Sequence, residues 1–181
     1  IEQYDSLFKL VLVSANTNIQ KLQKISRKFK ADNMAIHSVG IRNTSKKIEQ
    51  QNIIFGRDEI IEYFSKNKVH TVVFGTAGID DYKILKGIYP FVKRICIASK
   101  EVIVMAGVTG LLNEIKKKCD LLPVDSEHAA VHQLLDRARI SNVKKVILTA
   151  SGGPFYSKPS NDIDLENITP AQALNHPTWN M

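Results

Sequence analysis

The chain has 181 residues, of which 44% are hydrophobic and 24% charged, with a formal net charge of +7. This length allows one large domain or two small ones, and the composition indicates a soluble globular protein. No apolar run approaches the roughly 20 residues that a membrane span requires, and no signal peptide is visible, so we expect no membrane partner.

The first two-thirds of the chain alternates apolar runs with amphipathic segments. Branched and aromatic runs predict strands over 8–14, 34–39, 52–55, 69–74, 94–98 and 121–124. Apolar residues at helical spacing predict helices over 19–29, 57–65, 80–89 and 102–118, and the polar stretch 42–51 is expected at the surface. This alternation predicts an α/β fold, a parallel sheet with helices on both faces.

After Asp125 we predict a helix over 127–139, a strand over 143–149 and a long polar loop over 152–167. A short helix should begin near Thr169-Pro170, with Thr at the N-cap and Pro in the first turn. We place a domain boundary near Asp125, which divides the chain into 1–124 and 125–181.

The positive charge favours anionic partners, although solvated helix faces explain most of it equally well. No aromatic-interleaved basic motif is present, so we expect no nucleic-acid partner. Cys96 and Cys119 lie in or beside apolar runs and are expected as free thiols in a reducing compartment.

Ligands of a parallel sheet bind beyond the carboxyl ends of its strands, so these ends hold the candidate residues. Asn16, Thr17 and Asn18 can bind a ribose or its 2′-phosphate, or they can simply cap a helix. Gly75, Thr76, Ala77 and Gly78 can admit a flat ring or a phosphate, or they allow tight packing. No glycine-rich first turn is found, so either no dinucleotide binds or that turn precedes Ile1.

The most informative strand end is Asp125-Ser-Glu127, because residues i and i+2 of a strand share a face. Two carboxylates there suit Mg²⁺ or Mn²⁺, although Asp125 can also cap the following helix. Lys100 and Glu101 are adjacent, and such a lone Lys-Glu pair is usually an ion pair at the surface, so by itself it is weak evidence for a site. His128 and His132 are spaced for zinc, but no third ligand is apparent and packing is favoured.

Two further features lie towards the end of the chain. Ser151-Gly-Gly-Pro154 is either an anion-binding turn or an ordinary one. Trp179, the single tryptophan, is either part of a lid that closes over a ligand or a core residue.

Four strings in this order resemble the 1-deoxy-D-xylulose 5-phosphate reductoisomerase family. They are Ala98-Ser-Lys-Glu101, Leu122-Pro-Val-Asp-Ser-Glu-His128, Leu148-Thr-Ala-Ser-Gly-Gly-Pro-Phe155 and Leu174-Asn-His-Pro-Thr-Trp-Asn-Met181. The resemblance covers essentially the whole chain. It implies a homodimeric reductoisomerase that uses NADPH and Mg²⁺ or Mn²⁺ to turn 1-deoxy-D-xylulose 5-phosphate into 2-C-methyl-D-erythritol 4-phosphate in isoprenoid synthesis. It also implies a bacterial cytoplasmic or plastid-type location.

The resemblance also implies roles for single residues. Asp125 and Glu127 become metal ligands, and Glu127 with Lys100 and His176 the catalytic set. Substrate contacts are then Lys100, Ser126, Glu127, Ser151 and His176, with Trp179 as the flap residue. The cofactor lies along Asn16, Thr17 and Asn18, along Gly75 to Gly78, and beside Ser99, Lys100 and Glu101.

By this resemblance, residues 1–124 form an NADPH-binding Rossmann-like domain without its first βα turn. Residues 125–181 begin an α/β catalytic domain with its flap. The family usually has Asn where Ser99 stands, which weakens one cofactor contact. The chain therefore resembles an interior part of such an enzyme, and we expect it to be inactive alone. The alternatives are another NADP-linked oxidoreductase or a non-catalytic nucleotide-binding module.

Overall fold

The computed structural model describes residues 6–41, 53–76, 79–136, 140–147 and 152–177. The chain forms two compact units, Ile1–His132 and Gln133–Met181. Within the described ranges, no helix has the length and apolar character needed to cross a membrane.

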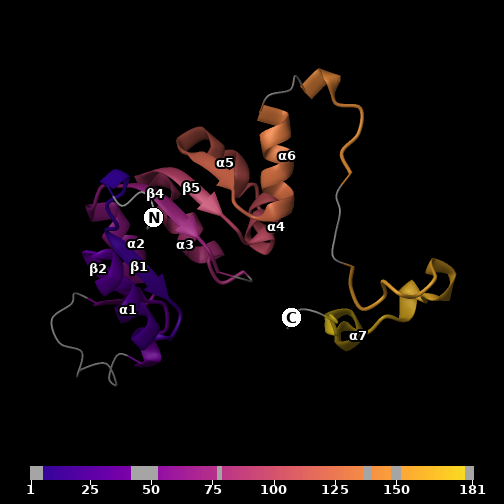
Figure 1. Cartoon of the computed structure of the whole chain (residues 1–181), viewed down its shortest axis with the longest axis horizontal. Coiled ribbons are helices and arrows are strands. Elements are labelled where there is room, and N and C mark those ends of the chain that lie inside the picture. The colour runs from indigo at the N-terminus through magenta and orange to yellow at the C-terminus, as the bar shows by residue number, and fades with distance from the viewer. Residues whose placement is uncertain (1–5, 42–52, 77–78, 137–139, 148–151, 178–181) are drawn as a thin grey trace. The chain divides into compact units, whose positions relative to one another are not determined.

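Strands and helices alternate along the described part of the first unit (Figure 1). In chain order the elements are β1 (Leu12–Ala15), α1 (Ile19–Phe29), β2 (Asn33–Ile36), η2 (Val39–Ile41), β3 (Ile53–Phe55), α2 (Arg57–Lys66), β4 (Val69–Phe74), α3 (Tyr82–Ile88), η4 (Tyr89–Phe91), β5 (Val92–Ile97), α4 (Lys100–Val108), α5 (Leu111–Lys118), β6 (Asp120–Pro123) and α6 (Ser126–Asp136), the last of which ends in the second unit. Among the described residues all strand pairing is parallel, in two three-stranded sheets of order β1-β2-β3 and β4-β5-β6. The predicted α/β class with parallel strands is confirmed.

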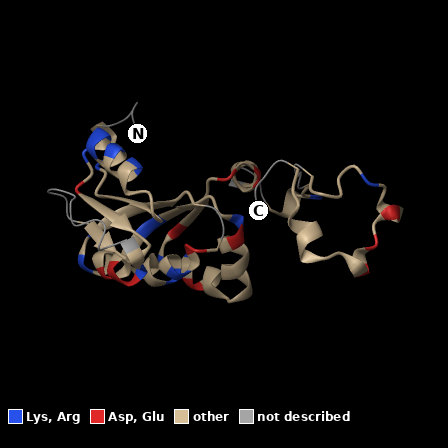
Figure 2. Ribbon diagram, turned by 90° about the horizontal axis from the view of Figure 1, so that it is seen from below, with Lys and Arg blue, Asp and Glu red and all other residues tan. Residues whose placement is uncertain are grey.

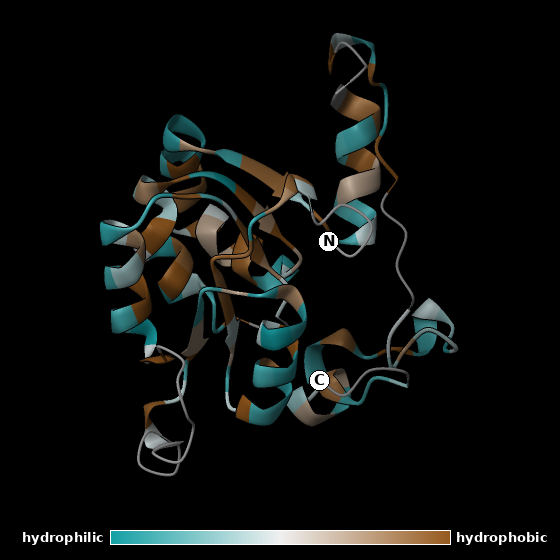
Figure 3. Ribbon diagram, turned by 60° about the vertical axis from the view of Figure 1, so that its left-hand side comes forward, coloured by the Kyte–Doolittle hydropathy of each residue, from teal (hydrophilic) through white to brown (hydrophobic). Residues whose placement is uncertain are grey.

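Strand β2 shows why helices cover both faces of the first sheet. Met34 and Ile36 pack with Leu22 of α1. Ala35, between them, belongs instead to the other core cluster, which includes Phe64 of α2. Successive strand residues point to opposite faces, so α1 and α2 lie on opposite sides of this sheet, as predicted. Figure 3 shows the strands in the hydrophobic colour and much of the helical surface in the hydrophilic one.

The two sheets share one hydrophobic core, because Ala35 of β2 belongs to the same cluster as the interior of the second sheet. The other members from β4, β5 and the helices α3 to α5 include Phe74, Ile95, Ile97, Ile84, Leu85, Ile88, Val102, Ala106 and Ile115. Each fully buried aliphatic side chain contributes about 1.5–3 kcal/mol of transfer free energy. This core holds the ends of β4, β5 and β6 in place.

The predicted single helix over 102–118 is wrong, since α4 and α5 are separate helices. Gly110 lies between them with φ +76°, a left-handed conformation that glycine adopts without steric cost. The hydroxyl of Thr109 donates to the carbonyl of Met105 at 2.9 Å and so closes α4. The continuous apolar spacing concealed this break.

The strand predicted over 8–14 begins later, at Leu12, and the one predicted over 34–39 is shorter than expected. A strand extends only where a neighbour pairs with it, and the register begins at Leu12 opposite Asn33. Phe8 is 60% exposed, so its apolar character did not place it in the sheet. The predicted surface segment 42–51 lies outside the described residues.

The second unit contains η5 (Ile140–Asn142), η6 (Ser160–Asp162), η7 (Leu165–Asn167) and α7 (Pro170–Leu174). The strand predicted over 143–149 is wrong for its described residues, because 143–147 have no regular structure. Ile147 is 72% exposed, and no strand of the described ranges pairs with this run. Apolar composition alone therefore does not make a strand.

The predicted start of α7 is confirmed. The hydroxyl of Thr169 accepts from the Gln172 backbone N–H at 3.3 Å, and Gln172 Oε1 accepts from the Thr169 N–H at 2.8 Å. This reciprocal capping box, with Pro170 in the first turn, satisfies two N–H groups that a helix start leaves free.

Candidate functional site

Three of the predicted motifs meet at one edge of the second sheet. Parallel strands β4, β5 and β6 end together, so the residues after Phe74, Ile97 and Pro123 share that edge. Two hydrogen bonds continue the ladder past the strand ends. The Ala98 N–H donates to the Phe74 carbonyl at 2.9 Å, and the Val124 N–H donates to the Ile97 carbonyl at 3.0 Å.

Ser99 and Lys100 leave this edge in different directions. Ser99 is 3% exposed and caps α4, since its hydroxyl accepts from the Val102 N–H at 3.4 Å and donates to Glu101 Oε2 at 3.0 Å. Lys100 pairs with Glu127, with Nζ 3.0 Å from Oε2. The expectation of a local Lys100–Glu101 pair is thus corrected, because Glu101 accepts from Ser99 and Lys100 reaches a different strand end.

The contact between Lys100 and Glu127 sets the charge of both groups. The Lys100 ammonium holds the pKa of Glu127 at about 2, with further help from a backbone N–H and the Ser126 hydroxyl, which donates at 2.9 Å. The same hydrogen bond raises the pKa of Lys100. At neutral pH the edge therefore presents a carboxylate beside an ammonium. The side chains are 50% and 30% exposed, so solvent screens the pair and its effect on stability is small.

Asp125 is held at the start of α6. Its side chain is 7% exposed, and Oδ2 accepts from the His128 backbone N–H at 3.1 Å. His128 Nδ1 lies 2.9 Å and 3.0 Å from the two carboxylate oxygens. The helix-capping alternative for Asp125 is therefore realised. His128 was expected to pack, and its bond to Asp125 was missed, although an Asp three residues before a His across a helix start is a readable signal.

The acidic strand end fits a hard cation in part. Each carboxylate as a whole keeps an unused acceptor position, although Glu127 Oε2 and Asp125 Oδ2 each already have two partners. Oxygen donors suit Mg²⁺ or Mn²⁺. The Lys100 ammonium already occupies a cation position beside Glu127. However, no group of three or more His, Cys, Asp or Glu side chains within the described ranges could enclose a metal. Asp125 and Glu127 can therefore supply two ligands, and the described residues do not complete the set.

The loop after β1 has features that suit an anionic group. Asn18 caps α1, accepting from the Lys21 N–H at 2.9 Å, so the capping alternative is realised here also. The first turn of α1 carries no acidic residue, and basic residues follow along the helix (blue in Figure 2). The positive end of a helix dipole favours anions. Asn16 and Thr17 precede this cap.

The turn after β4 is open at Gly75, where an added Cβ would meet no atom within 4 Å. A flat group can therefore approach the backbone there. Thr76 donates its hydroxyl to Asp81 Oδ2. Ala77 and Gly78, also predicted at this turn, lie outside the described residues.

In the second unit, His176 contacts the glycine turn predicted to bind phosphate. Its Nε2 lies 3.2 Å from the Gly152 carbonyl oxygen. Gly152 has φ +88°, and an added Cβ would come within 2.8 Å of Tyr156 Cβ, so the turn requires glycine. Two predicted substrate motifs therefore lie together in this unit. Ser151 and Trp179 lie outside the described residues.

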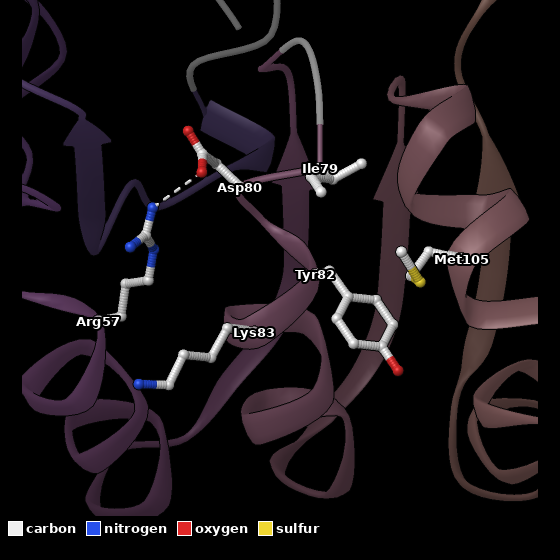
Figure 4. A pocket seen from close by; sticks show the side chains of 6 residues that line it. All are labelled: Arg57, Ile79, Asp80, Tyr82, Lys83 and Met105. Carbon is white, nitrogen blue, oxygen red and sulfur yellow. Dashed lines mark ion pairs between the residues drawn. The ribbon is translucent and has the colours of Figure 1, made fainter. Parts of the chain in front are cut away.

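A pocket of about 220 Å³ lies elsewhere in the first unit (Figure 4). It is lined by Arg57, Ile79, Asp80, Tyr82, Lys83 and Met105. Both of its cations are already paired: Arg57 lies 3.2 Å from Asp80, and Lys83 lies 3.1 Å from Asp58. We assign no ligand to it.

A parallel sheet covered by helices, with carboxylate, ammonium and hydroxyl groups at its carboxyl edge, defines an α/β protein of the class whose ligand sites lie at that edge. A family model of 1-deoxy-D-xylulose 5-phosphate reductoisomerase matches residues 1–107, and one of the C-terminal domain of the same enzyme matches residues 121–181. The chain belongs to the 1-deoxy-D-xylulose 5-phosphate reductoisomerase family, as its four motifs predicted.

Curated relatives agree with this assignment. The chain is 38% identical to the 1-deoxy-D-xylulose 5-phosphate reductoisomerase of Ruminiclostridium cellulolyticum over 96% of its length and 46% of the relative's. It is 32% identical to that of Leptospira interrogans, over 100% of the chain and 46% of the relative. The chain thus spans about half the length of the curated relatives it matches.

Solved structures of the family share the fold. A reductoisomerase from Zymomonas mobilis in complex with NADPH superposes with a TM-score of 0.77 at 26% identity, over 98% of this chain and 47% of that one. A DOX-P reductoisomerase in complex with NADPH, fosmidomycin and magnesium gives 0.76 at 29% identity, over 100% and 47%.

Proposed function

We propose that the protein carrying this chain uses NADPH and a divalent metal to convert 1-deoxy-D-xylulose 5-phosphate into 2-C-methyl-D-erythritol 4-phosphate, a reaction of isoprenoid synthesis. The observation that carries the proposal is the convergence of Lys100, Asp125 and Glu127 at one sheet edge, where an ion pair of 3.0 Å joins two of the family motifs. The relatives named for this activity support it.

Asp125 and Glu127 would hold Mg²⁺ or Mn²⁺, and a neighbour solved with magnesium supports this choice of ion. When bound, the metal polarises the oxygens of the hydroxy-ketone substrate. The backbone N–H and the ring Nδ1 of His128, in the first turn of α6, fix the orientation of the Asp125 carboxylate. Lys100 keeps Glu127 ionised and places a second positive charge beside the substrate. Ser126 positions Glu127 through its hydroxyl.

NADPH would lie along the edges of both sheets, and neighbours solved with NADPH support this cofactor. Asn16, Thr17 and Asn18, ahead of the basic helix α1, would receive the adenosine 2′-phosphate. The cofactor would pass along the turn from Gly75 and Thr76 to Gly78, where the backbone at Gly75 is open. Its nicotinamide end would lie beside Ser99, Lys100 and Glu101. The protein supplies orientation, and the hydride comes from the cofactor.

The substrate phosphate would bind at Ser151, beside the turn that His176 contacts. His176 would thereby orient this turn and face the substrate, and Trp179 would cover it as a flap. A neighbour solved with fosmidomycin supports a small phosphorylated sugar as ligand. We also propose a homodimer and, because the relatives are bacterial, action in the bacterial cytoplasm.

We place the cofactor domain at 1–124 and the start of the catalytic domain at 125–181. The two family models support a boundary in this region, since one ends at residue 107 and the other begins at residue 121. The compact units divide slightly later, after His132.

The product of the full gene tests the proposal directly. NADPH oxidation would be followed with deoxyxylulose phosphate, with Mn²⁺, Mg²⁺ or a chelator, and the product identified by mass spectrometry. We expect turnover that requires both sugar phosphate and metal. Turnover that survives the chelator would indicate another NADP-linked oxidoreductase, and NADPH binding without turnover would indicate a nucleotide-binding module.

A further inference from the structure

A buried pair of titratable side chains lies in the first unit, outside the predicted site residues. His37 follows β2, and Asp81 precedes α3, with Nδ1 4.0 Å from Oδ1. The side chains are 6% and 2% exposed. Burial lowers the pKa of His37, against the opposing influence of Asp81. Burying a carboxylate is costly unless polar partners compensate for its lost hydration, so the surroundings of Asp81 need an explanation.

The carboxylate of Asp81 does not serve its own helix. Asp81 is the N-cap residue of α3, a position where Asp normally accepts from the first N–H groups, yet its side chain makes no such bond. Oδ2 accepts instead from the Thr76 hydroxyl, and Oδ1 faces His37. The side chain therefore lies between the turn after β4, which holds Thr76, and the segment after β2, which holds His37.

Each end of this link is attached to a loop that we assign to NADPH. Thr76 belongs to the turn after β4. On the other side, the His37 N–H donates to the Ala15 carbonyl at 3.0 Å, and the Ser38 N–H donates to the Asn16 carbonyl at 3.1 Å. Asn16 opens the loop proposed to receive the 2′-phosphate. The two loops follow different three-stranded sheets, and no strand pairing of the described ranges joins those sheets.

We propose that Asp81, with His37 and Thr76, forms a positioning network that fixes the spacing of the two cofactor loops and thereby sets the affinity for NADPH. This inference rests on the proposed function. The network acts through the loops and touches neither metal nor sugar phosphate. Asp81 is hydrogen-bonded to Thr76 and buried against His37, whose Nδ1 at 4.0 Å is beyond hydrogen-bond distance, so burial of the pair holds the loops ready for the cofactor before it binds.

Asp81→Asn tests the network, with Asp80→Asn as the matched control. The control removes the same charge one residue away, from a carboxylate that is 67% exposed and pairs with Arg57. The NADPH dissociation constant of the full gene product would be measured by cofactor fluorescence without sugar phosphate. We expect an increase of about tenfold in Asp81→Asn and less than about twofold in Asp80→Asn, with Mn²⁺ affinity and the KM for sugar phosphate unchanged in both.

Thr76 supplies a second test that keeps the Asp81 carboxylate and removes only its hydrogen-bond donor. Thr76→Val removes the hydroxyl and should weaken NADPH binding, whereas Thr76→Ser keeps the donor and should restore it. If Asp81→Asn does not fold, this exposed position decides the question. NADPH affinity in Asp81→Asn or Thr76→Val equal to the control would overturn the network while leaving the proposed function intact. A wild-type protein that binds no NADPH would overturn both.

Discussion

Replacing Asp125 in two ways separates its capping role from its proposed role as a metal ligand. Asn is as good an N-cap as Asp, so Asp125→Asn keeps the acceptor for the His128 N–H and loses mainly the charge at the helix start, about 0.3–1 kcal/mol. Asp125→Ala removes the cap as well and leaves His128 without its carboxylate partner. We expect it to cost about 1–2 kcal/mol of unfolding free energy.

Turnover should follow a different order from stability. Both variants lack a charged ligand, so both should lose metal-dependent NADPH oxidation on the order of 100-fold or more, although only the alanine variant is clearly less stable. Denaturant titration and Mn²⁺-dependent kinetics of the full gene product measure the two effects. Asp120→Asn is the matched control, at the opposite end of β6, where Asp120 is 65% exposed and pairs with Arg94. Wild-type turnover and metal dependence in Asp125→Asn would show that Asp125 only caps α6.

Three further predictions concern the cofactor, the ion pair and the packing. The loop 16–18 carries no acidic residue to select NADH, so kinetic efficiency should be clearly higher with NADPH, and equal efficiency would contradict the assignment. Lys100→Met should raise the pKa of Glu127 from about 2 towards its ordinary 4.5, seen in a carboxyl carbon NMR titration. Because the Lys100–Glu127 pair depresses this pKa, the pair stabilises the folded wild type above about pH 4.5, and this stabilisation is lost as the pH falls towards 2. An unchanged Glu127 titration in the variant would refute the role of Lys100. Gly87→Ala would place a Cβ 2.5 Å from Ile61 Cδ1, so the Ile61 side chain or the two helices must shift. We expect this overpacking to cost about 1–3 kcal/mol, offset by about 1 kcal/mol of better helix propensity, and a melting temperature above wild type would refute this packing.

Local patterns predicted the elements that local physics determines. The helix over 19–29 and the strand over 69–74 have the predicted bounds, because an amphipathic period or a dense branched run specifies each. The run 143–149 has similar composition but no pairing neighbour in the described ranges, and strand formation depends on that neighbour. The break at Gly110 was hidden by apolar residues on both sides.

The site was predictable in its residues and less so in its contacts. The strand-end rule correctly located Ser99, Lys100, Asp125 and Glu127 at one edge. The partner of Lys100 was missed because it lies 27 positions away in the sequence, beyond any helical or strand period. The link between His37 and Asp81 joins loops of different sheets, and no spacing in the sequence reveals it.

The parallel ladder has a consequence for how this edge can change. Lys100 and Glu127 lie in the first turns of α4 and α6, so the lengths of β5 and β6 decide where these helices begin at the edge. In the observed register Arg94 lies opposite Asp120 and Ile97 opposite Pro123. Deleting one residue inside β5 would turn the remaining strand residues to the opposite face or draw the start of α4 back along the strand, and either change would move Lys100 away from Glu127. Strand length, and not only the identity of the motif residues, therefore encodes the chemistry of this edge.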